Sequence, residues 1–174
     1  MSLGAPQDEK VDGKGLRVAV CHTRWNAEFV AALVSNAVGE LEASGAKVSS
    51  VHACSGVFEL APLCARVARK GGIDGIIAIG CIIRGETDHY TLLASETTRA
   101  LGMLALELGT NPQAVALTFG VLACNDTAQA KARIGNGREF ARTCVSQALL
   151  LRAVEADGFA GGRAGAAGEG MGDD

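Results

Sequence analysis

Two kinds of hydrophobic pattern alternate along the chain. Short runs rich in β-branched residues, such as residues 16–21 and 75–80, are typical of strands, and the second run is apolar at every position between its glycines. Between such runs, apolar residues recur every three or four positions, as Phe29, Leu33 and Leu41 do, which is typical of amphipathic helices. The alternation predicts parallel strands joined by helices.

Strands are expected at residues 16–21, 47–53, 75–80 and 114–119. Helices are expected around Phe29 to Leu41 and at residues 59–70, 87–108, 127–133 and 138–155. With right-handed crossovers, this order predicts an α/β fold, a three-layer α/β/α sandwich around a four-stranded parallel sheet. We expect a flavodoxin-like sheet with strand order 2-1-3-4.

The two ends of the chain differ from its middle. Residues 1–15 are polar and Gly-rich, and residues 158–174 are dominated by Gly and Ala with hardly any large apolar side chain. We expect disorder at both ends, because such segments bury too little apolar surface to offset the entropy of ordering. The remaining residues 16–157 are expected to form one domain, in keeping with a length of 174 residues.

Composition and charge exclude several classes of protein. The net charge of −3 offers no basic surface for nucleic acid or for anionic membranes, so we expect neither as a partner. Apolar runs such as Ile76 to Ile83 are much shorter than the ~20 residues of a spanning helix. Because residues 1–15 lack the apolar core of a secretory signal, we expect a cytoplasmic location.

The six cysteines are expected to be mostly buried free thiols. None of them forms a CxxC pair, and a reducing compartment disfavours disulfides. Cys21, Cys54, Cys81 and Cys124 fall singly at the ends of four strands, without the paired spacing of structural zinc sites, so we expect no metal.

Polar and aromatic residues gather where the predicted strands end. In open parallel α/β sheets, ligands bind beyond the carboxyl ends of the strands. The segments that follow the strands are residues 22–26, 54–59, 81–89 and 119–125. They contain neither a P-loop nor a GxGxxG motif, which removes the common nucleotide-binding signatures.

A phosphate is one candidate ligand at this edge. Gly85, Glu86 and Thr87 open a predicted helix, where free amides and the helix dipole attract anions. The alternative is that Thr87 or Asp88 simply caps the helix. Arg133 is a candidate partner for a phosphate oxygen, although an exposed helical arginine is usually only solvated.

Three further side chains have two interpretations each. His89 lies one turn into the same predicted helix and could transfer protons near a bound phosphate, or be a surface histidine. Trp25 and Phe119 could stack on a planar heterocycle, or anchor a core or an interface.

Considered together, these segments resemble one family over residues 16–157. They look like the motifs of lumazine synthase, the 6,7-dimethyl-8-ribityllumazine synthase of riboflavin biosynthesis. The stretch from Gly80 to Tyr90 carries the most specific part of the resemblance. The matching segments are residues 24–26, 55–60, 80–90, 119–122 and 129–133.

The resemblance implies an enzyme that condenses 5-amino-6-(D-ribitylamino)uracil with 3,4-dihydroxy-2-butanone 4-phosphate. The products are the lumazine, phosphate and water, and the family uses neither an organic cofactor nor a metal. His89 matches the proton-transfer residue. Trp25, Val57, Phe58, Glu59, Cys81, Ile82, Ile83 and Phe119 match residues that bind the pyrimidine and ribityl groups, and Gly85, Glu86, Thr87 and Arg133 match the phosphate site.

The resemblance also implies a homo-oligomer with active sites between subunits, where Phe119 and Arg133 come from the adjacent chain. Pro6, Asp8, Glu9 and Lys10 stand where cage-forming members carry apolar strand residues, which favours a pentamer over a sixty-subunit capsid. The alternative functions are a flavin- or lumazine-binding protein without catalysis, and a shell-forming structural protein.

Overall fold

The computed structural model describes residues 11–161, with side chains as far as residue 157. In that range, the elements follow one another as strand and helix in strict alternation until the last strand. They are β1 (Arg17–Thr23), α1 (Ala27–Ala43), β2 (Lys47–Cys54), α2 (Leu60–Lys70), β3 (Gly75–Ile83), α3 (His89–Thr110), β4 (Ala116–Cys124), α4 (Thr127–Lys131), the 3-10 helix η1 (Ile134–Asn136) and α5 (Gly137–Gly161).

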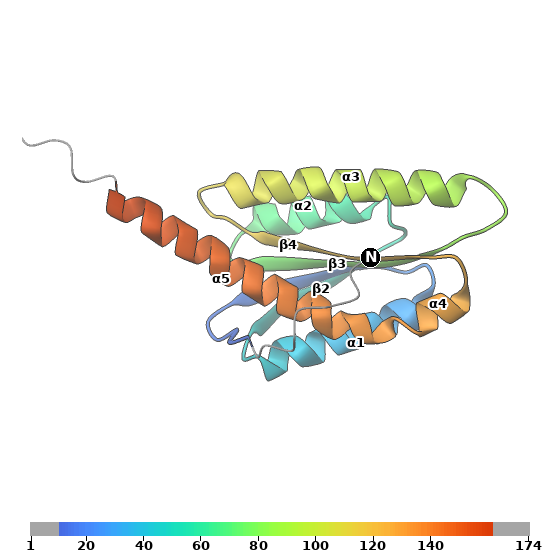
Figure 1. Cartoon of the computed structure of the whole chain (residues 1–174). Helices are drawn as coiled ribbons and strands as arrows, with labels where there is room; N and C mark the ends of the chain where they lie inside the picture. The colour runs from blue at the N-terminus through green and yellow to red at the C-terminus, as the bar shows by residue number, and fades with distance from the viewer. Residues whose placement is uncertain (1–10, 162–174) are drawn as a thin grey trace, which may run out of the picture.

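The strands form one parallel sheet in the order β2-β1-β3-β4. Helices α2 and α3 cover one face of the sheet, and α1, α4 and α5 cover the other (Figure 1). The predicted α/β/α sandwich and its strand order are therefore confirmed.

Alternating residues of the two central strands build two cores. Val18 and Val20 of β1 pack toward α1 and α5, whereas Ala19 and Cys21 pack toward α2 and α3. The same alternation continues along residues 76–79 of β3. Because both faces are covered, the central positions of these strands must be apolar, which explains the continuous hydrophobic runs.

The predicted third and fourth strands were too short. β3 continues to Ile83 and β4 to Cys124, since these two strands stay paired in register as far as Ile83 and Cys124. Gly80 and Gly120 therefore lie inside strands. At Gly80 the reason is packing: an added Cβ would lie 2.9 Å from Cγ1 of Val57.

Two helix boundaries that bear on the site also differ from prediction. α3 begins at His89 and not at Thr87, with Asp88 at the N-cap position, so His89 is its first residue. α4 ends at Lys131, and Arg133 lies in the following turn before η1. The phosphate-binding segment predicted at a helix start is thus a loop that leads into the helix.

The predicted domain boundaries need correction at both ends. Residues 11–15 are part of the fold, because Val11 packs against the core and the amide of Gly13 donates a hydrogen bond to the carbonyl of Ser44 at 2.8 Å. α5 continues to Gly161 and so crosses the predicted boundary at residue 157. Residues 1–10 and 162–174 lie outside the described residues.

The cysteines follow the prediction. All six are free thiols, and five are buried while Cys54 is half-buried. No helix among the described residues has both the length and the apolar character needed to cross a membrane.

Candidate active site

A cavity of about 690 Å³ opens at the carboxyl ends of the strands. The end of β3, the loops that follow β1 and β2, and the first turns of α3 enclose it. Ten residues predicted for the site line this cavity: Trp25, Val57, Phe58, Glu59, Cys81, Ile82, Ile83, Gly85, Thr87 and His89. Glu86, Phe119 and Arg133 do not line it.

The end of β3 presents one edge of its backbone to this region. β1 pairs with β3 only as far as Ile79, whereas β4 pairs with β3 up to Ile83. Residues 80–83 therefore lie beyond the strand pairing on the β1 side. A planar ligand with donors and acceptors could pair with that edge as a further strand would.

Asn26 belongs to the segment expected at this edge, but no role was predicted for it, and the structure shows that it organises the edge. Its backbone adopts a left-handed conformation with φ of 56°, and its carbonyl accepts the first hydrogen bonds of α1 from the amides of Phe29 and Val30. Its side-chain amide donates to the carbonyl of Cys81 at 2.9 Å. Asn tolerates the left-handed region better than most residues, which was the available sequence signal.

The loop after β2 is held by short polar contacts. The amide of Gly56 donates to the Glu59 carboxylate at 2.9 Å, and the amide of Arg24 donates to the carbonyl of Cys54 at 3.0 Å. Val57 is buried against Gly80, so the adjacent Phe58 is directed outward. These contacts bring the loop after β2 close to the loop after β1.

The two aromatic side chains at the rim are exposed. Trp25 is 72% exposed and Phe58 is 67% exposed, although each lines the cavity. Trp25 therefore does not anchor the core of the chain, and stacking on a ligand or packing at an interface are the two interpretations left. Exposed aromatic faces beside a cavity are suited to stacking on a planar ligand.

The first turns of α3 supply one wall. His89, Leu92, Leu93 and Glu96 follow helical spacing and line the cavity together with Tyr90. Leu92, Leu93 and Glu96 were missed, although their spacing from His89 was a usable signal. Tyr90 lay in the stretch that carries the resemblance, but no role was predicted for it. The Arg84 guanidinium lies 4.3 Å from the Tyr90 ring centroid and its Nε donates to Asn125 at 3.2 Å, so both ends of the preceding loop are held.

The cavity thiol is not suited to nucleophilic catalysis. Burial raises the pKa of Cys81 to about 11, with a further contribution from the neighbouring Cys124 thiol. Burial also raises the pKa of Cys54 and of Cys124. Because the thiolate is the nucleophile, Cys81 contributes its backbone and its volume to the cavity. Within residues 11–161, no three His, Cys, Asp or Glu side chains gather as a metal site would require.

A family model for 6,7-dimethyl-8-ribityllumazine synthase matches residues 15–152, a range that includes every predicted site residue. The chain belongs to the lumazine synthase family. Lumazine synthases are transferases, so the protein is an enzyme of this class.

Three lumazine synthases illustrate the similarity. The protein from Kineococcus radiotolerans is 37% identical over 158 residues, which cover 87% of this chain and 94% of that relative. The one from Leifsonia xyli subsp. xyli is 36% identical over 159 residues, which cover 87% of this chain and 96% of that relative. The one from Leptothrix cholodnii is 37% identical over 145 residues, which cover 82% of this chain and 91% of that relative.

Phe119 and Arg133 stand apart from this lumazine synthase cavity. Phe119 lies on β4, an edge strand of the sheet, and is 44% exposed. The Arg133 guanidinium donates to the carbonyl of Gln129 at 2.9 Å, within the turn that follows α4. A single chain therefore gathers ten of the predicted site residues in one cavity, whereas Phe119, Arg133 and Glu86 lie outside it.

Proposed function

We propose that the protein condenses 5-amino-6-(D-ribitylamino)uracil with 3,4-dihydroxy-2-butanone 4-phosphate to give 6,7-dimethyl-8-ribityllumazine, phosphate and water. The observation that carries the proposal is the cavity itself. It gathers ten residues assigned to this reaction, within a segment that the family model matches.

The pyrimidine substrate is assigned to the β3 side of the cavity. Trp25 stacks on the ring, while backbone groups of Cys81, Ile82 and Ile83 bind its polar edge. The β1-side edge of residues 80–83 supports this assignment: it has no strand partner, although the Cys81 carbonyl already accepts from Asn26, and its backbone donors and acceptors match those of a heterocycle. The segment Val57, Phe58 and Glu59 binds the ribityl chain.

The phosphorylated substrate is assigned to the loop before α3. The backbone amides of Gly85, Glu86 and Thr87 bind the phosphate, and the amides at the start of the 22-residue helix α3 add a favourable field. His89 stands at the first position of that helix, within the cavity. It is therefore placed to exchange protons with a substrate whose phosphate rests on the same loop.

The reaction needs protons to be moved and substrates to be held. The amine attacks the ketone, water and phosphate leave, and the ring closes. One general acid/base contributes about 10²–10⁴-fold to such steps, and holding the two substrates in reactive geometry contributes much of the remainder. His89 supplies the first effect and the walls of the cavity supply the second.

The family implies an oligomer, and we propose a pentamer whose subunits complete one another's sites. Phe119 and Arg133 of one subunit then reach the cavity of its neighbour, because neither lines the cavity of its own chain. Three apolar side chains of α3 are also exposed: the exposed fractions of Leu92, Met103 and Leu106 are 64%, 60% and 72%. So many exposed apolar side chains on one helix are typical of an interface. A head-to-tail contact that buries such surfaces closes into a ring.

The test is an absorbance assay for lumazine formation, run beside mass measurement of the native particle. We expect lumazine to form only when both substrates are present, and a mass five times that of the chain. A yellow, flavin-bound protein that forms no lumazine would contradict the enzymatic proposal. A sixty-subunit particle with full activity would overturn only the pentamer.

A further inference from the structure

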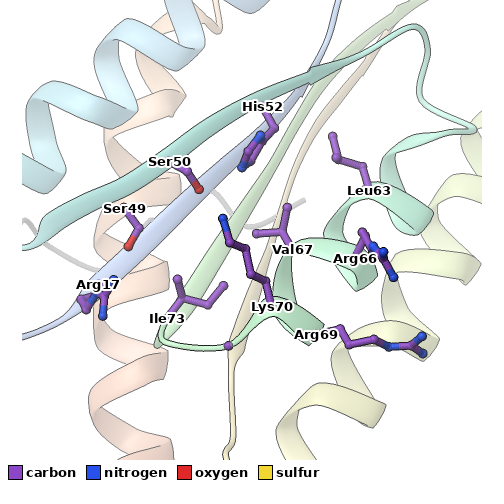
Figure 2. Close-up of a pocket in the computed structure, with 11 residues that line it drawn as sticks. Arg17, Ser49, Ser50, His52, Leu63, Arg66, Val67, Arg69, Lys70 and Ile73 are labelled. Atoms are coloured by element: carbon purple, nitrogen blue, oxygen red, sulfur yellow. The ribbon is translucent and has the colours of Figure 1, made fainter.

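A second cavity, of about 610 Å³, lies between β2 and the carboxyl-terminal half of α2 (Figure 2). It shares no lining residue with the candidate active site. Its size falls within the range of about 300–1,000 Å³ that is typical of small-molecule sites. Its residues have no role in the proposed condensation.

The charged residues that line this cavity are all basic. Arg17, Arg66, Arg69 and Lys70 line it together with His52, and no Asp or Glu does. Among the described residues, none of the four Arg and Lys side chains has an ion-pair partner. Such a cluster is unexpected in a chain whose net charge is −3. Positive charge without carboxylate partners favours an anionic ligand.

The arrangement on α2 has a cost that an anion would relieve. Arg66 is three positions from Arg69 and four from Lys70, so it lies close to two like charges along α2. In Figure 2, Lys70 extends toward β2, whereas Arg66 and Arg69 extend away from it. The dipole at the end of α2 favours Arg69 and Lys70 there. The helix dipole does not explain why Arg17, which belongs to β1, lines the same cavity.

The position of Arg17 depends on the turn after α2. Gly72 has a φ of +73°, and a Cβ added there would lie 3.4 Å from Nη1 of Arg17. Asp74 lies close by, but its carboxylate accepts a hydrogen bond from the backbone amide of Arg17 at 2.7 Å and pairs with Arg152 at 2.6 Å. The Arg17 guanidinium is thus placed beside the cavity without being neutralised by that carboxylate.

The remaining walls offer hydroxyl groups and an apolar surface. Ser50 and His52 lie on the face of β2 that is turned toward α2, and Lys70 extends from the end of α2 toward them in Figure 2. The Ser49 hydroxyl is buried without a hydrogen-bond partner in the described part of the chain. Leu63, Val67 and Ile73 add apolar contacts.

We propose that this cavity binds a small organic diphosphate. Lys70 and Arg17 hold the phosphate groups from opposite sides of the cavity, and the serine hydroxyls of β2 supply further donors. The apolar side chains of α2 contact the organic part of the ligand. Arg17 and Lys70 offer one cation for each phosphate group of a diphosphate, and the mixed wall favours an organic ligand over a bare inorganic ion.

Calorimetric titration of the full chain with ADP tests the proposal, with adenosine as the uncharged probe. We expect ADP to bind at one site per chain and adenosine to release no heat. Lys70→Gln and Arg17→Gln should each weaken ADP binding about tenfold or more, since each removes a charge-assisted hydrogen bond. Both side chains are on exposed residues, so an unchanged melting temperature should accompany the loss.

Two control variants keep the test specific. Lys14→Gln removes an exposed positive charge near the same end of the sheet but outside the cavity, and should leave the affinity unchanged. Arg133→Gln should also leave it unchanged, because the proposed catalytic phosphate site is separate. The proposal is overturned if wild-type protein does not bind ADP, if Lys70→Gln and Arg17→Gln bind it normally, or if Arg133→Gln abolishes binding.

Discussion

The side-chain amide of Asn26 donates a 2.9 Å hydrogen bond to the main-chain carbonyl of Cys81 and so links the ends of β1 and β3. Both residues line the cavity assigned to the pyrimidine. Asn26 occupies a left-handed backbone conformation, at the point where the chain leaves β1 and enters α1. Asn26 therefore reverses the chain direction after β1, begins α1 and fixes the position of the β3 edge that is proposed to bind the pyrimidine.

Two substitutions at Asn26 separate these effects. Asn26→Gly keeps the backbone conformation but loses the hydrogen bond, which should cost about 0.5–1.5 kcal/mol in the free energy of unfolding. Asn26→Ala loses the bond and adds about 1–2 kcal/mol for a left-handed alanine. Urea unfolding measures both changes. Equal stabilities of the two variants would show that the backbone conformation carries no strain here.

Loss of the imidazole at His89 should affect turnover and leave the fold intact. His89 is exposed at the start of α3, so His89→Ala should shift the melting temperature little. The rate of lumazine formation should fall about 100-fold or more, as expected for a lost general acid/base. His52→Ala is the matched control, because His52 lies outside the candidate active site and should leave the turnover near that of wild type.

Mixed oligomers test whether two chains share a site. His89→Ala and Arg133→Ala homo-oligomers should both be poorly active, the second through a raised KM for the phosphorylated substrate. If the variants are denatured together and reassembled one to one, about a quarter of the sites combine an intact His89 with an intact neighbouring Arg133 in a head-to-tail ring. Activity should return to about that fraction of wild type. No recovery would place both residues in one chain's site.

The packing of Val57 on Gly80 predicts a stability loss beside the cavity. Gly80→Ala places a Cβ 2.9 Å from Cγ1 of Val57, and overpacking of this kind costs about 1–3 kcal/mol. The displaced loop should also weaken binding of the ribityl substrate. Gly39→Ala is the control, because nothing lies within 4 Å of its Cβ and the helix α1 should gain about 0.4–1 kcal/mol. Denaturation midpoints of the two variants should therefore move in opposite directions.

Buried thiols predict an alkaline loss of stability. Burial raises the pKa of Cys144 to about 12 from an ordinary value of 9.0. Below pH 9 the thiol is protonated in both the folded and unfolded states, so its contribution is fully present. As the pH rises from about 9 toward 12, only the unfolded state releases the proton, and the free energy of unfolding falls by about 1.4 kcal/mol per pH unit for this group.

Cys144→Ala isolates that contribution. The variant should be less stable at neutral pH, because it leaves a small void in the core, but its stability should fall less steeply above pH 9. Urea unfolding at a series of pH values on both sides of 9 gives the two slopes. Identical slopes would show that the Cys144 thiol does not retain its proton in the folded protein.

Several features of the site were predictable because they depend on local pattern. The segments after β1, β2 and β3 were assigned to one edge of the sheet, since parallel strands all end on the same side. Trp25, the residues around Phe58 and His89 do line one cavity there. Asn26 was not predictable in the same way, because its role depends on the carbonyl of Cys81, which is distant along the chain.

The sequence by itself determined the alternation of strands and helices, since a sheet covered on both faces requires continuous apolar runs and its covering helices require one apolar side. Only the tertiary structure decided where β3 and β4 end, because pairing between strands carries them past Gly80 and Gly120. The tertiary structure also decided that Phe119 and Arg133 lie outside the candidate active-site cavity. It likewise placed Arg17 in the same cavity as the basic residues of α2. The physical reason is common to these cases: hydrogen-bond and charge partners far apart along the chain become neighbours only when the sheet and its helices assemble.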